Sequence, residues 1–158
     1  MTDADPKTKL IVLLHGIDFG RRYYAFCDEH KGKSPDRAIA RADYEQALAA
    51  TGLSFSFDAR EKFFGHRETA GELKLTLNVL IGHGDLELVL AIESPRGKTG
   101  GTFHGLAYQV QLLDQPEFQH SPKYPRIPFH SSQELQAAAQ FAVGLYQQAR
   151  ALIIEERW

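Results

Sequence analysis

The sequence predicts one α+β domain, in which N-terminal helical segments precede a four-stranded antiparallel β-meander and a long C-terminal helix packs on the sheet. Three observations predict this class. Apolar and polar residues alternate through the middle of the chain, apolar residues recur at helical spacing near its end, and helix-forming segments fill its first third. A sheet with one apolar face must bury that face, and helices at both ends of the chain can cover it.

The first third begins with a polar stretch, residues 1–8, which we expect to be a flexible tail of the domain that spans residues 1–158. Residues 9–30 are ambiguous. The segment from Lys9 to His15 fits a buried strand, but it also fits the start of one helical apolar stripe. We favour a helix with a break near Gly20, because glycine weakens a helix.

A second helix is predicted from Asp36 to Ala50. Ser34 can cap it, Pro35 suits its first turn, and Gly52 follows its end. After it, apolar residues alternate with serines from Leu53 to Phe57, which predicts the first strand. Residues 59–70 either extend that strand or form a loop into the meander.

The meander is the strongest pattern in the chain and runs from Gly71 to Leu113. Every second residue is apolar from Leu73 to Val79 and again from Leu86 to Ile92. Successive side chains of a strand point to opposite faces, so both runs describe strands with one buried side. We predict a further strand from Phe103 to Leu113.

A glycine-rich segment, residues 94–102, separates the last two predicted strands. Its glycines and positive charges are typical of an exposed, mobile tip. Arg96 and Lys98 are therefore secondary candidates for contact with a partner.

The final helix starts at a capping-box pattern, Ser131 to Glu134, and continues toward Trp158. Its apolar surface is wider than the single stripe that a helix needs to pack on one neighbouring element. Either the helix lies deep across the sheet, or an outer stripe made by Phe141, Ile154 and Trp158 forms the interface of a homodimer.

The composition argues against several partners. Eighteen basic and 20 acidic residues leave no basic footprint for nucleic acid and no polybasic patch for a membrane. The apolar run from Leu10 to Leu14 is too short to cross a bilayer. Cys27 is the only cysteine, so we expect a buried structural thiol and a reducing, cytoplasmic setting.

No catalytic constellation, cofactor motif or metal site is predicted. His83 and His104 lie at opposite ends of a predicted strand that spans roughly 30 Å, so they cannot share an ion. His66 and His104 could approach each other at one end of the sheet, but no paired-ligand spacing supports a site there. The acidic residues are dispersed as well, and their spacing assigns no acid–base pair.

The segment Asp114–His130 differs from ordinary connections. It contains four of the seven prolines, with aromatic residues between them, so neither a helix nor a central strand can form. Such a loop is either a strap packed on the domain or a recognition surface, and the two can coincide. The candidate partner-binding residues here are Phe118, His120, Lys123, Tyr124, Arg126 and Phe129.

These observations predict a small non-catalytic protein-binding module, such as a bacterial immunity, adaptor or chaperone-like protein. The alternative is a helix-grip-like domain that binds a small ligand or acts as an enzyme, with a cavity between the sheet and the last helix. A self-assembling structural subunit is a third interpretation.

Overall fold

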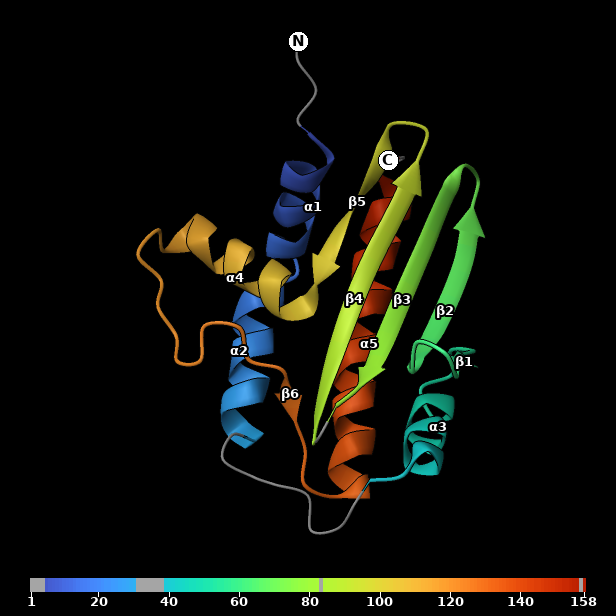
Figure 1. Cartoon of the computed structure of the whole chain (residues 1–158). Coiled ribbons are helices and arrows are strands. Elements are labelled where there is room, and N and C mark those ends of the chain that lie inside the picture. The colour runs from blue at the N-terminus through green and yellow to red at the C-terminus, as the bar shows by residue number, and fades with distance from the viewer. Residues whose placement is uncertain (1–4, 31–38, 83, 157) are drawn as a thin grey trace.

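The computed structural model describes residues 5–30, 39–82, 84–156 and 158 and confirms the α+β class: helices and an antiparallel sheet, with a long helix at the C-terminus (Figure 1). The helices are α1 (Pro6–His15), α2 (Phe19–His30), α3 (Arg41–Ala49), α4 (Phe103–Asp114) and α5 (Ser132–Glu155). The strands are β1 (Ser56–Asp58), β2 (Phe63–Ala70), β3 (Leu73–Ile81), β4 (Asp85–Ser94), β5 (Gly97–Thr102) and β6 (Ile127–Pro128).

The sheet has the order β1-β2-β3-β4-β5, and β6 also pairs with β4. β5 pairs with residues 89–94 of β4, whereas β6 pairs with Asp85 and Leu86 at the other end of that strand. Both strands therefore lie along the same edge of β4. Between β5 and β6 the chain leaves the edge of β4, forms α4 and the loop after it, and then returns to the same edge.

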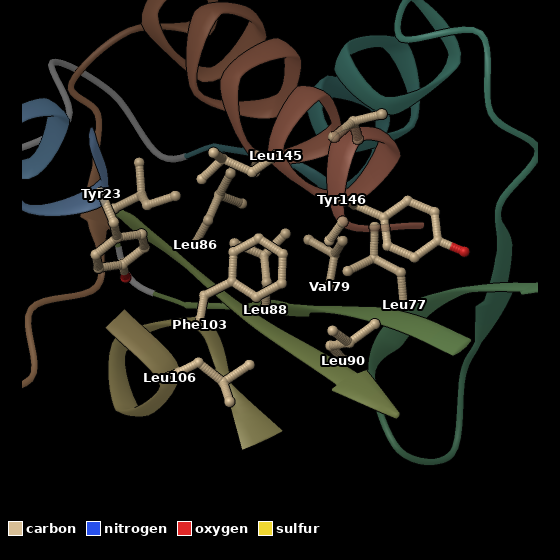
Figure 2. Close-up of a cluster of buried hydrophobic side chains, with 14 of the residues drawn as sticks. Tyr23, Leu77, Val79, Leu86, Leu88, Leu90, Phe103, Leu106, Leu145 and Tyr146 are labelled. Carbon is tan, nitrogen blue, oxygen red and sulfur yellow. The ribbon is translucent and has the colours of Figure 1, made fainter. Parts of the chain in front are cut away.

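The core lies between the sheet and α5. The register places Leu77 opposite Leu90 and Val79 opposite Leu88, so these side chains share one face. Figure 2 shows them in one cluster with Leu145 and Tyr146 of α5 and Phe103 of α4. In the part of the chain that the structure describes, the helices leave the other face of the sheet uncovered (Figure 1).

The predicted strand from Phe103 to Leu113 is wrong, because this segment forms α4. Its buried residues recur at spacings of three and four, and Thr102 caps the helix by accepting a hydrogen bond from the Gly105 amide at 3.1 Å. β5 takes the expected place in the meander, within the segment predicted to be a mobile tip. Gly100 (φ +142°) is required there, because a Cβ would lie 2.0 Å from the Leu90 carbonyl oxygen.

The N-terminal helices are confirmed, including the segment from Lys9 to His15, but the break lies at residues 16–18 rather than at Gly20. Gly20 lies inside α2, where a Cβ would come within 2.7 Å of the Ala107 carbonyl oxygen of α4. α1 already starts at Pro6, so the end of the expected tail is helical.

The third helix lies within the predicted range but begins at Arg41. Its predicted first residues and its cap, Ser34, lie outside the described residues. Among the described residues, the sheet has six strands rather than four. β2 forms from the segment left open at residues 59–70, and the two residues of β6 are too few to show a periodic pattern.

None of the helices in the described segments has both the length and the apolar character needed to cross a membrane.

Candidate functional site

The proline-rich loop is held by side chains of α2. We call residues 115–126 the strap; it runs beside α2 before entering β6 (Figure 1). The Tyr23 hydroxyl donates to the Pro125 carbonyl oxygen at 2.6 Å, and the Tyr24 hydroxyl donates to that of Lys123 at 2.8 Å. The Cys27 thiol lies 3.7 Å from the Arg126 carbonyl oxygen. Buried carbonyl groups need partners, and here α2 supplies them in place of a regular ladder.

Burial keeps these three donors protonated. It raises the pKa of the Cys27 thiol to about 12 and raises the pKa values of the Tyr23 and Tyr24 hydroxyls above their ordinary range. Cys27 is only 2% exposed, as predicted for a structural thiol. At neutral pH all three groups can therefore donate to the strap.

Side chains alternate in direction where the strap enters β6. Tyr124 is 48% exposed and the Arg126 side chain 49% exposed, whereas Pro125 between them is buried. Phe129, a predicted partner contact, is fully buried with its ring centroid 6.0 Å from that of Tyr44. Pairing of β6 with β4 turns this ring into the core, so Phe129 is excluded from the candidate surface.

Lys123 and Tyr124 meet a residue of α4 that sequence analysis did not select. The rings of Tyr108 and Tyr124 are T-shaped, with centroids 5.4 Å apart and planes at 76°. The Lys123 ammonium lies 4.6 Å from the Tyr108 centroid and 5.3 Å from the Tyr124 centroid. The two phenol groups raise the pKa of Lys123, so the amine is a cation at neutral pH. We call these three residues the tyrosine–lysine cluster.

Arg126 belongs to a neighbouring charged group. Its guanidinium nitrogen lies 3.2 Å from one carboxylate oxygen of Glu87, on β4. The other oxygen of Glu87 lies 3.5 Å from Nε2 of His104, at the start of α4. The His104 ring lies 5.8 Å from the ring of Tyr124, so this group adjoins the tyrosine–lysine cluster.

A surface hollow of about 770 Å³ adjoins the cluster and shares Tyr108 and Lys123 with it. It is lined by Tyr108, Pro116, Glu117, Phe118, Gln119, His120 and Lys123. The Tyr24 ring supports its floor, with centroid distances of 4.9 Å to Phe118 and 4.7 Å to His120. His120 Nδ1 lies 2.6 Å from the Pro122 carbonyl oxygen and Nε2 lies 2.8 Å from an Asp28 carboxylate oxygen. Both ring nitrogens therefore have a polar partner within the protein.

The structure thus brings together five of the six candidates from the proline-rich segment: Phe118, His120, Lys123, Tyr124 and Arg126. It adds His104 and Tyr108, which were missed because their segment was expected to be a strand. On a helix these two residues are four positions apart and share one face. The helical spacing of the buried residues in that segment was the signal that could have identified them.

Arg96 and Lys98 lie elsewhere. They belong to the β4–β5 hairpin, where Lys98 is opposite Glu93. This hairpin is at the end of β4 remote from β6, and therefore remote from Arg126. Both residues are exposed, but they form no joint surface with the strap.

The three residues proposed for a dimer interface have neighbours within the chain. Phe141 stacks on Phe26 with a centroid distance of 4.2 Å, and Lys9 approaches the Trp158 ring at 5.1 Å. Ile154 is half-buried against the core. Phe141 and Trp158 therefore each contact an N-terminal helix, α2 and α1 respectively.

A separate polar cluster lies on the core side of β2. The Glu68 carboxylate accepts hydrogen bonds from the Tyr146 hydroxyl at 2.9 Å and from Arg150, and it contacts His66 Nε2 at 2.7 Å. Desolvation opposes ionisation, but these donors together hold the pKa of Glu68 below its ordinary value. The cluster ties α5 to the sheet edge.

His66 and His104 belong to different polar groups. His66 contacts Glu68 of β2, whereas His104 contacts Glu87 of β4. His83 lies outside the described residues. Across the described ranges, no group of three or more histidine, cysteine or acidic residues is arranged to hold a metal ion.

No family model, curated protein or solved structure matches this chain. The function of the strap therefore has to be inferred from its own contacts and charges.

Proposed function

We propose that this chain is a non-catalytic protein-binding module and that its docking surface is the exposed side of the strap, comprising Tyr108, Lys123, Tyr124 and Arg126. One observation carries the proposal. The strap backbone is fixed by Tyr23, Tyr24 and Cys27, while the side chains of Tyr124 and Arg126 remain about half exposed.

This combination suits binding for an energetic reason. Ordering a loop on association costs free energy, and a strap that is already ordered avoids this cost. Tyrosine and arginine are also the residue types that most often dominate interface energies. Tyr124 offers a rigid aromatic face, and Arg126 offers a planar set of donors suited to a carboxylate or to peptide carbonyl groups.

The chemistry of the surface supports binding rather than catalysis. His120 is engaged at both ring nitrogens, and His104 lies beside Glu87. The Cys27 thiol is buried, and its raised pKa disfavours the nucleophilic thiolate.

A small-ligand cavity between the sheet and α5 receives less support. The layer between them is filled by apolar side chains such as Leu77, Val79 and Leu145 (Figure 2). The hollow at the strap is lined by residues of α4 and the strap, and α5 contributes none of them.

We place this module among the small bacterial immunity, adaptor or chaperone-like proteins and in the reducing cytoplasm. The buried, unpaired Cys27 supports the reducing setting.

The test is affinity capture from the native host with the double variant Tyr124→Ala/Arg126→Ala. Truncation of two interface anchors costs about 2 kcal/mol or more, so partner recovery should fall by roughly thirtyfold. The melting temperature should change by only a few degrees, because both side chains point outward.

The matched control is Arg96→Ala/Lys98→Ala, which removes two exposed cations at the far end of β4. This variant should retain capture. Undiminished capture by a folded Tyr124→Ala/Arg126→Ala variant would refute the strap as the docking surface. Loss of capture in the control alone would place the docking surface at the β4–β5 hairpin.

A further inference from the structure

The Lys123 ammonium occupies a position that an external cation could also occupy. Two tyrosine rings from different elements, Tyr108 on α4 and Tyr124 on the strap, stand nearly at right angles at 76°. The ammonium lies within 5.3 Å of both ring centroids. Perpendicular aromatic faces around one cation are the arrangement by which proteins bind methylated ammonium groups.

We propose that Tyr108 and Tyr124 form a binding site for an organic ammonium group, and that Lys123 of the chain itself fills this site until an external cation replaces it. The inference rests on the proposed docking function and names the chemistry of its ligand. The group is either a methylated lysine side chain of the partner or a free quaternary ammonium ion, because the two share the same recognition chemistry.

Exchange requires little rearrangement. The backbone of Lys123 is fixed by the bond from the Tyr24 hydroxyl to its carbonyl oxygen, while its side chain is exposed. The long, flexible lysine side chain can therefore leave the rings without disturbing the strap. Tyr124 is 48% exposed, so one ring remains accessible from solvent.

The surroundings provide room and a favourable charge. The hollow begins at the Tyr108 ring and contains Phe118, whose ring centroid lies 6.1 Å from that of Tyr108. Glu117 lines the same hollow, so a carboxylate is available near an incoming cation. Lys123 would repel a second cation at the rings, so the structure predicts replacement rather than joint occupancy.

The test compares tetramethylammonium chloride with sodium chloride at equal ionic strength, using NMR spectra of ring-labelled tyrosines. The proteins are the wild type, Lys123→Ala, Lys123→Ala/Tyr108→Leu and the control Lys98→Ala. If Lys123 fills the site about 80% of the time, its removal should strengthen tetramethylammonium binding by roughly fivefold. Tyr108→Leu should abolish this gain while keeping an apolar side chain, and Lys98→Ala should match the wild type.

Two arms distinguish the source of the cation. A short peptide with one trimethyl-lysine that binds Lys123→Ala roughly tenfold more tightly than tetramethylammonium would indicate a protein ligand. Equal affinities would indicate a free organic cation.

Two results would overturn the site: tyrosine signals in Lys123→Ala that respond to tetramethylammonium no more than to sodium, or a response that survives Tyr108→Leu. Because the titration needs no partner, its failure with intact partner capture would reject the ammonium site and leave the docking function standing.

Discussion

The hydroxyl of Tyr23 donates a hydrogen bond to the carbonyl oxygen of Pro125 at 2.6 Å, and this buried contact joins α2 to the end of the strap. Tyr23 is 1% exposed, so water cannot easily replace the bond. The two residues are 102 positions apart in the chain. The shape of the docking surface therefore depends on a long-range contact made by a residue outside it.

Removal of this hydroxyl should destabilise the protein. Tyr23→Phe leaves the Pro125 carbonyl buried without its donor, which costs about 1–3 kcal/mol of unfolding free energy. Tyr24→Phe is the matched control, because its bond to Lys123 is only partly buried and water can substitute. Urea denaturation measures both variants. A larger loss for Tyr24→Phe than for Tyr23→Phe would contradict this account of the strap.

Acid should weaken the tie between α5 and the sheet. The pKa of Glu68 is held below its ordinary value of 4.5, so its stabilising contribution is complete above that pH and is lost as the pH falls through the folded-state pKa. Unfolding free energies measured from about pH 6 down to about pH 3 should fall more steeply for the wild type than for Glu68→Gln. Parallel curves would show that Glu68 contributes no acid sensitivity.

Gly100 should tolerate no side chain. In Gly100→Ala the new Cβ would lie 2.0 Å from the Leu90 carbonyl oxygen, so β5 must move away from β4. We expect a loss of more than about 4 kcal/mol or failure to fold. Gly97→Ala is the control: its φ of +124° is also strained, but nothing lies within 4 Å of the new Cβ. Its cost should be about 1–3 kcal/mol in thermal unfolding, and equal losses in the two variants would rule out the clash as the cause.

Cys27 should be unreactive in the folded protein. A thiol with a pKa of about 12 that is 2% exposed offers almost no accessible thiolate at pH 8. An aromatic disulfide reagent should therefore react with it only as fast as α2 or the strap opens, and rapidly in urea. Tyr23→Phe, which removes the buried bond to Pro125, should accelerate the native reaction more than Tyr24→Phe does. Fast labelling of the folded wild type would mean that the strap opens readily.

The alternating pattern predicted β3 and β4 because one face of each strand is apolar along its whole length. The same type of pattern wrongly predicted a strand at Phe103–Leu113, because the apolar residues of this segment also recur at helical spacing. Gly97–Thr102 was expected to be a mobile tip because glycine is common in loops. Its glycines instead allow β5 to approach β4 closely. The need for a residue without a side chain at Gly100 becomes visible only from the position of Leu90 on β4.

By itself the sequence determined the α+β class, the long final helix and the fact that the proline-rich segment could form neither a helix nor a central strand. These properties follow from local spacing and from the missing amide hydrogen of proline. Only the tertiary structure decided that Tyr23, Tyr24 and Cys27 hold the strap, that Phe129 is buried and that Tyr108 joins Lys123 and Tyr124. Those contacts join residues up to about a hundred positions apart, and which side chains meet depends on how α2, α4 and β6 pack together rather than on any pattern along the chain.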